Sequence, residues 1–146
     1  LEDWSYCSKK ALELFEFGQK KAAENGMILV DTKYEMGKDE DGNILLIDEI
    51  HTPDSSRYWI ANSYEKRMKK QLEPQNIDKE FLRLWFVDNC DPYNDKMLPE
   101  APEDLVLELS SRYIYLYETI TGALFPFPNS EKSIYNRIND NLKEVL

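Results

Sequence analysis

Charged side chains gather in two stretches of this sequence, LVDTKYE at residues 29–35 and LIDEIHTPDSSRYW at residues 46–59. The first stretch places Asp31, Lys33 and Glu35 at alternate positions. Because successive side chains of a strand point to opposite faces, this spacing predicts that the three charges share one face. A solvated sheet face would explain such a row on its own, so a functional site requires partners from elsewhere in the chain.

The second stretch supplies one partner, the carboxylate of Asp48, at the end of another apolar run. An antiparallel register that opposes Glu35 and Asp48 would bring both carboxylates within reach of one cation. Like charges directly opposite each other destabilise a strand pair unless a positive charge lies between them. A magnesium ion, held by one or two carboxylates and by nucleotide phosphates, would supply that charge. We therefore predict Glu35 and Asp48 as magnesium ligands.

Periodicity and turn signals predict the elements that position these residues. An amphipathic helix starts near Asp3, the candidate N-cap, and ends before Gly26. Its stripe of apolar and small residues consists of Trp4, Cys7, Ala11, Leu14, Phe15, Gly18 and Ala22. Branched residues in MILVDTKYEMG and NILLIDEI, on either side of KDEDG, then predict two antiparallel strands with a tight connection.

Two further helices and a loop are expected downstream. The stretch NIDKEFLRLWFVDN predicts a helix that is capped by Asp78 and ends near Cys90. The stretch APEDLVLELSSRYIYLYETITG predicts another helix, with Pro102 in its first turn and Gly122 at its end. The polar stretch at residues 62–76 predicts a loop, and the tail predicts a proline-broken connector followed by a short polar helix.

Composition limits the fold and the class of function. The chain has 146 residues, 42% hydrophobic and 12% aromatic, which fits one ordinary domain of the α+β class, with antiparallel strands and packed helices. The formal net charge of −10 opposes binding to a nucleic-acid backbone. No apolar run approaches the roughly 20 residues of a membrane span, and no signal peptide is recognisable, so the cytoplasm is expected. His51 is the only histidine, and it is expected in a loop after a strand.

Four stretches, in this order, carry a resemblance to a known family: LVDTKYEMG, LIDEIHTPDSSRYW, DKEFLR and YETITG. They resemble the C-terminal part of the SAICAR synthetases, the phosphoribosylaminoimidazole-succinocarboxamide synthase family, in the form found in yeast-like members. The similarity spans residues 4–122, and its first two motifs are long and specific. It implies a C-terminal domain at residues 1–122 and an extension at residues 123–146. The implied fold is the C-terminal, ATP-binding half of an ATP-grasp-like or kinase-like structure.

The resemblance implies an ATP-dependent carbon–nitrogen ligase of purine biosynthesis. Such an enzyme joins aspartate to carboxyaminoimidazole ribonucleotide with ATP and Mg²⁺, by way of an acyl phosphate that the aspartate amine attacks. The residues implied to act in catalysis are Lys33, Glu35 and Asp48, with Glu35 and Asp48 near the magnesium ion and the ATP phosphates. The residues implied to bind substrate are Asp31, Asp54, Ser55, Arg57, Asp78, Lys79 and Arg83.

The residue types in the turn suit this chemistry. The planar guanidinium of Arg57 can bind a phosphate through two parallel hydrogen bonds. Asp54 can accept hydrogen bonds from ribose hydroxyls or orient that arginine. Pro53 would stiffen the turn and leave the hydroxyls of Ser55 and Ser56 available to oxygen acceptors.

The sequence also departs from the family. The glycine-rich hairpin that covers ATP, its lysine and the early substrate loop have no counterpart here, and neither G-x-G-x-x-G nor a P-loop pattern occurs. We therefore expect a partial enzyme that is inactive alone and needs the missing N-terminal half as its partner. The alternative is a non-catalytic acidic module whose carboxylate face binds divalent ions or a basic partner.

Overall fold

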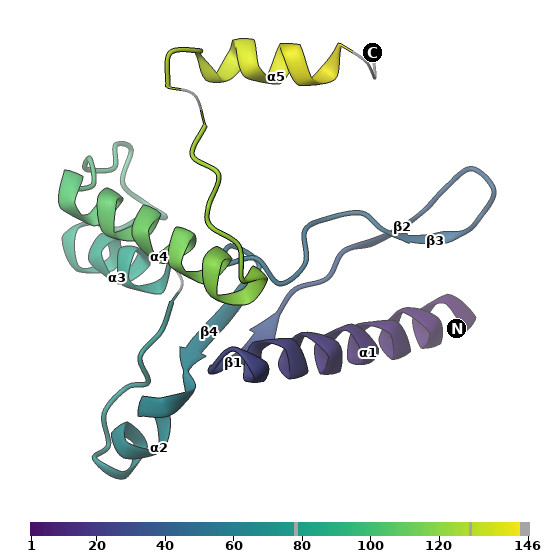
Figure 1. Cartoon of the computed structure of the whole chain (residues 1–146), viewed down its shortest axis with the longest axis horizontal. Helices are drawn as coiled ribbons and strands as arrows, with labels where there is room; N and C mark the ends of the chain where they lie inside the picture. The colour runs from purple at the N-terminus through teal and green to yellow at the C-terminus, as the bar shows by residue number, and fades with distance from the viewer. Residues whose placement is uncertain (78, 129, 144–146) are drawn as a thin grey trace.

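The computed structural model describes residues 1–77, 79–128 and 130–143 (Figure 1). A long helix comes first, antiparallel strands follow it, and the other helices come after the strands, which confirms the α+β class. The elements are α1 (Glu2–Glu24), β1 (Met27–Thr32), β2 (Met36–Lys38), β3 (Ile44–Leu46), β4 (Ser56–Ile60), α2 (Ala61–Lys69), α3 (Glu80–Asn89), α4 (Glu103–Thr121) and α5 (Ile134–Leu142). No helix in the described part of the chain combines the length and the hydropathy that a membrane span requires.

The first helix forms as predicted, but its start differs. Leu1 occupies the N-cap position and Asp3 lies inside the first turn, where its charge favours the helix dipole without capping. Gly26 follows the helix with a φ of 72°, a left-handed conformation that suits glycine and turns the chain into β1. Gly18 and Ala22 are buried, whereas Trp4 is 75% exposed, so the predicted stripe is fully buried only in its C-terminal part.

The strand pairing differs from the prediction. The tight hairpin is confirmed only for β2 and β3, whose register pairs Met36 with Leu46. The first strand pairs instead with β4, from Met27 opposite Ile60 to Thr32 opposite Ser56. Ser56 and Arg57, which were predicted in a turn, therefore begin a strand of their own, SRYWI. Its alternation explains this, because Tyr58 points into the core while its neighbour Arg57 is exposed.

The hydrophobic core lies where α1, β1, β4 and α4 meet (Figure 1). Its buried apolar residues are Ala22, Met27, Leu29, Tyr58, Ile77 and Leu116, with Phe15, Ile60 and Ile120 packed against them. Tyr58 and Leu29 are the largest side chains that are fully buried. This core packs against the β1–β4 pair, and the exposed ends of these two strands carry the site.

The predicted loop at residues 62–76 is wrong over its first half, which forms α2. The ring of Tyr64 stacks on Trp59 of β4, with centroids 5.3 Å apart and planes at 18°. This anchor attaches a polar helix to the strand before it. The stretch contains no glycine or proline until Pro74, so nothing in its backbone opposes a helix.

The remaining helices agree with the predictions. Lys79 is the N-cap of α3, and the predicted cap, Asp78, lies outside the described residues. Pro102 is the N-cap of α4, one position before its expected place, and Gly122 ends that helix with a φ of 70°. The Ser133 hydroxyl caps α5 by accepting from the amide of Asn136 at 3.2 Å.

Candidate functional site

A pocket of about 420 Å³ lies between β1, the turn before β4, and α3. It brings together six of the predicted substrate-binding residues: Asp31, Asp54, Ser55, Arg57, Lys79 and Arg83. The seventh, Asp78, is outside the described residues. Pro53, Leu82 and Phe86 give the pocket an apolar part, and Ser56 and Glu80 complete its lining.

Asp31 and Arg57 form the wall of this pocket that comes from the strands. They are opposite each other in the β1–β4 register, and the Arg57 Nε donates to both carboxylate oxygens of Asp31 at 2.9 Å. The guanidinium Nη2 also contacts Asp31, and this pairing holds the pKa of the carboxyl below its usual value. Asp31, and not Asp54, is therefore the residue that orients Arg57.

The opposite wall is fastened to the turn by a second ion pair. The Lys79 ammonium at the start of α3 donates to the Asp54 carboxylate, which lowers the pKa of Asp54. Within α3, Arg83 donates to Glu80 at 2.8 and 2.5 Å, which lowers the pKa of the Glu80 carboxyl. Each of the three cations that line the pocket is thus held in place by a carboxylate.

The turn itself is ordered by hydroxyl contacts. The Thr52 Oγ1 donates to a carboxylate oxygen of Glu49 at 2.7 Å and accepts from the Ser55 amide at 3.3 Å. At the end of the turn, the Ser56 hydroxyl donates to Thr32 Oγ1 on β1 at 2.8 Å. A local bond between backbone and side chain, such as that from the Ser55 amide to Thr52, favours one turn geometry over others.

A second cluster adjoins the pocket and contains the three predicted catalytic residues. The Lys33 ammonium lies 2.5 Å from Glu35 Oε1 and 3.3 Å from Asp48 Oδ2. Both carboxylates raise the pKa of Lys33, Glu35 more strongly. The backbone amide of Glu49 and then Lys33 lower the pKa of Asp48. The Lys33 amide also donates to the Ser55 carbonyl at 3.1 Å, which joins this cluster to the pocket wall.

The predicted face of three charges is only partly correct. The strand ends at Thr32, so alternation does not extend to Glu35, and Asp31 pairs with Arg57 away from the other two charges. The predicted opposition of Glu35 and Asp48 is also wrong by one residue, because the Ile47 amide donates to the Glu35 carbonyl. The convergence of both carboxylates on one positive charge is nonetheless observed, and that charge is the ammonium of Lys33.

Glu35 and Asp48 present oxygens to one point, which fits one aspect of magnesium binding. Mg²⁺ is commonly held by one or two carboxylates together with substrate phosphates. Within residues 1–77, 79–128 and 130–143, no group of three or more His, Cys, Asp or Glu side chains is arranged to hold a metal ion. A divalent ion at this pair would therefore depend on oxygens that a nucleotide brings.

Three participants were not anticipated from the sequence. Glu80 holds Arg83, and its position inside the DKEFLR motif was the available signal. Thr52 orders the turn, and the threonine–proline–aspartate–serine composition of TPDS is a recognisable turn signal. His51 was expected to be an unremarkable loop residue, yet its Nε2 lies 2.7 Å from the Tyr34 hydroxyl. Its contacts join segments that are distant in the sequence, so no local pattern could reveal them.

Comparison with known proteins gives concordant findings. The family model described as SAICAR synthetase matches residues 1–100. A chloroplastic phosphoribosylaminoimidazole-succinocarboxamide synthase of Arabidopsis thaliana is 60% identical over 144 residues, covering 99% of this chain and 35% of that protein. The enzyme of the same name from Legionella pneumophila strain Paris is 55% identical over 145 residues, covering 99% of this chain and 46% of that protein.

Solved structures are similar as well. The SAICAR synthase of Saccharomyces cerevisiae in complex with SAICAR matches 80% of this chain and 38% of that one, with a TM-score of 0.61 and 36% identity. A SAICAR synthetase in complex with ADP matches 87% of this chain and 41% of that one, with a TM-score of 0.60 and 31% identity. This chain thus spans less than half the length of the proteins it matches.

Proposed function

The chain belongs to the SAICAR synthetase family, and from this premise we propose that it forms part of a ligase of purine biosynthesis. The ligase joins aspartate to carboxyaminoimidazole ribonucleotide with ATP. The observation that carries this proposal is the pocket of about 420 Å³, in which three cations from β4 and the start of α3 face one space. Relatives solved with ADP and with SAICAR support a nucleotide and the product as ligands.

The proposed reaction has two steps. A carboxylate oxygen of the imidazole substrate attacks the γ-phosphorus of ATP, and ADP leaves with the electrons of the broken bond. The aspartate amine then attacks the acyl carbon, phosphate departs, and the amine gives up a proton to solvent. Phosphoryl transfer depends chiefly on positioning and charge neutralisation. We assign that work to the ammonium of Lys33, which lies beside both carboxylates of its cluster.

The pocket is proposed to bind the ribonucleotide. Asp31 fixes the plane of the Arg57 guanidinium, which suits it to a phosphate group. Lys79 and Arg83 add positive charge from α3, and we assign Asp54 and Ser55 to the ribose hydroxyls. We also propose Asp78 as a substrate-binding residue, because it is the first residue of the DKEFLR motif.

Magnesium is proposed at Glu35 and Asp48. When bound there with the nucleotide, the ion would neutralise charge on the phosphates. Lys33 already holds both carboxylates toward one point, so the chain keeps these oxygens oriented. The proposed substrates and cofactors are thus aspartate, carboxyaminoimidazole ribonucleotide, ATP and Mg²⁺.

The rest of the enzyme is proposed as the partner of this chain. Since the chain spans less than half of its relatives, we propose that the other portion supplies the glycine-rich cover over ATP and the early substrate loop. We propose that residues 1–122 form the domain that carries the site and that residues 123–146 are its extension. For the compartment we propose the cytoplasm. Two plant relatives are named as chloroplastic enzymes, so the plastid is the alternative compartment. Cell fractionation would distinguish the two.

A chimera tests the proposal. This chain replaces the matching 144-residue stretch of the Arabidopsis thaliana relative, and ATP-dependent coupling of radiolabelled aspartate is measured. We expect turnover that is lost in the variant Lys33→Met. The matched control is Lys69→Met, because Lys69 is an exposed lysine on α2 whose ammonium lies 3.8 Å from Glu65, outside the pocket. A folded chimera that binds Mg²⁺ without turnover would favour the acidic, non-catalytic module instead.

A further inference from the structure

His51 occupies an unusual position in the segment between β3 and β4. Its backbone has a φ of 58°, in the left-handed region that non-glycine residues seldom adopt, although histidine is among those enriched there. Residues are kept in such conformations only where the surrounding contacts require it. The segment that it interrupts carries Asp48 on one side and Asp54 with Ser55 on the other.

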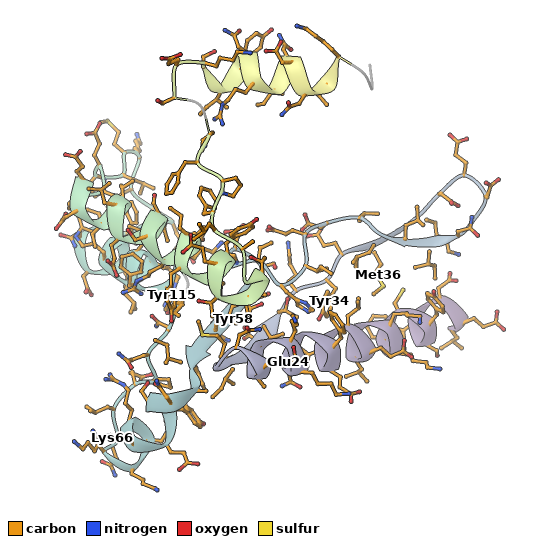
Figure 2. The ribbon with its side chains drawn as sticks, in the orientation of Figure 1. Glu24, Tyr34, Met36, Tyr58, Lys66 and Tyr115 are labelled. Carbon is orange, nitrogen blue, oxygen red and sulfur yellow. The ribbon has the colours of Figure 1, made fainter. Side chains whose placement is uncertain are left out.

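Three elements hold His51. Its Nε2 lies 2.7 Å from the Tyr34 hydroxyl, and the two rings meet edge to face with centroids 5.7 Å apart. Its carbonyl accepts from the hydroxyl of the buried Tyr58, on β4, at 2.7 Å. Figure 2 shows Tyr34 on the connection from β1 to β2, beside α1, and Tyr58 on β4.

The third contact is with α1, at Gly18. A Cβ placed on Gly18 would lie 2.5 Å from His51 Cε1 and 2.7 Å from both His51 Nε2 and Leu29 Cδ2. The ring therefore rests against the helix backbone, in space that any larger residue would take. The His51 ring and the buried Leu29 side chain together account for a glycine in the interior of a long helix, where alanine would otherwise be favoured.

Tyr34 connects this arrangement to the proposed catalytic cluster. It stands between Lys33 and Glu35, while His51 stands three residues after Asp48. Two backbone hydrogen bonds join the same segments: the Lys33 amide donates to Ser55, and the Ile47 amide donates to Glu35, both at 3.1 Å. Fixing Tyr34 against His51 thus fixes Lys33 and Glu35 relative to Asp48.

We propose that His51 is a positioning residue. By binding Tyr34, accepting from Tyr58 and resting on Gly18, it locks residues 33–35 to residues 47–55 and so sets the separation between Lys33 and the carboxylate of Asp48. Its significance for catalysis rests on the proposed function of that cluster. The locking itself is a property of the chain and can be measured without any substrate.

The test is amide hydrogen exchange, followed by NMR in the full chain. In His51→Ala we expect the amides of Lys33 and Ile47, which bridge the two segments, to exchange about three- to tenfold faster, the effect of losing one hydrogen bond. The amides of Asp39 in the hairpin and Ile77 in the core, which donate to Asn43 and Tyr58, are internal controls and should stay unchanged. Unchanged exchange at Lys33 and Ile47 would overturn the proposal.

Two conservative variants separate the side chain from the backbone. His51→Gln places an acceptor near the position of Nε2 and should restore slow exchange. His51→Asn tolerates a left-handed backbone equally well or better, but its amide is too short to reach Tyr34, so exchange should stay fast. If Asn restores protection as fully as Gln, the residue acts through its backbone alone and the proposal is wrong.

A second route covers the case in which His51→Ala does not fold. Tyr34→Phe removes only the hydroxyl that contacts His51, so it should reproduce the faster exchange at Lys33 and Ile47. Tyr115→Phe, at a tyrosine of α4 that is 51% exposed, is the matched control. In the chimera, Tyr34→Phe should lower kcat more than it raises the KM for ATP. An inactive unmodified chimera would count against the proposed function, while the exchange results would still decide the role of His51.

Discussion

Asp31 and Arg57 are held face to face by two hydrogen bonds of 2.9 Å from one guanidinium nitrogen, across strands that lie 26 residues apart in the sequence. The pair is half-exposed, with 48% of the aspartate and 56% of the arginine side chain accessible. Ion pairs this exposed contribute little to stability. Its value is therefore geometric, because it sets the orientation of a planar cation at the edge of the pocket.

Replacing Arg57 by lysine tests this orientation. Arg57→Lys keeps the charge but loses the planar fork, so we expect ribonucleotide affinity in the chimera to fall about tenfold, while ATP affinity changes less than about twofold. Isothermal titration calorimetry measures both. Arg67→Lys is the matched control, since Arg67 donates to the Glu73 carbonyl, outside this pocket. Equal losses for both ligands would make Arg57 a structural residue.

The paired carboxylates should matter for turnover and not for folding. Glu35→Gln and Asp48→Asn each remove one negative charge from the Lys33 cluster, and we expect turnover of the chimera to fall about 10²- to 10³-fold. The melting temperature should stay the same, because both side chains are exposed. Glu65→Gln, on α2, is the control. Full turnover at saturating magnesium in either variant would remove that residue from the site.

The ion pair between Asp54 and Lys79 should contribute weakly to stability. A double-mutant cycle with Asp54→Asn and Lys79→Met is expected to give a coupling free energy of about 0.2–1 kcal/mol, as for other exposed pairs. Urea unfolding of the four proteins measures it. The same substitutions should weaken ribonucleotide binding more than they change unfolding. A coupling several times larger would mean that the pair holds α3 onto the sheet.

Stability should depend on pH through His51. Burial lowers the pKa of His51 below its ordinary value of 6.5, so near that pH the unfolded chain binds more protons than the folded one. The contribution of His51 to the free energy of unfolding is therefore constant above the ordinary pKa of 6.5. It decreases as the pH falls through 6.5 toward the lower pKa of His51 in the folded chain. Tyr34 and Tyr58 have raised pKa values, about 12 for Tyr58, and stay protonated throughout.

Urea unfolding at pH 7.5, 6.5 and 5.5 measures this dependence. The decrease should be smaller in His51→Gln, which has no group that titrates in this range. If the unfolding free energies of the unmodified chain and of His51→Gln changed in parallel with pH, His51 would have the same pKa in the folded and unfolded chains.

The chain alone should be a poor catalyst. Without a cover over the Lys33 cluster, water screens its charges, and interactions weaken several-fold from their value in a closed site. We expect no detectable ligase activity from residues 1–146 and an affinity for magnesium-ATP no better than about millimolar. Activity should return when the N-terminal portion of a relative is supplied as a separate chain. Robust turnover by the isolated chain would contradict the two-part site.

The sequence was sufficient to predict which residues gather, but not how they pair. Local rules correctly predicted α1, α3, α4 and the ends marked by Gly26 and Gly122, because these depend on neighbouring residues. The partner of Arg57 depended on which strand lies beside β1, and that choice is made by Tyr58 entering a core built from four elements. Residues 62–76 were predicted from polarity alone, which cannot distinguish a surface helix from a loop.

The pairing of β1 with β4 also affects how quickly the protein becomes functional. Contacts such as Thr32 with Ser56 and Asp31 with Arg57 join residues 24 and 26 positions apart, whereas the β2–β3 hairpin closes locally. Closing a long loop costs chain entropy before the hydrogen bonds and packing of the paired strands can offset that cost, so such contacts form late and slowly. During synthesis the pocket cannot assemble until Lys79 has left the ribosome, long after the hairpin is complete. The edge of β1 is therefore unpaired for an interval during synthesis. In this interval the nascent chain can bind chaperones or aggregate.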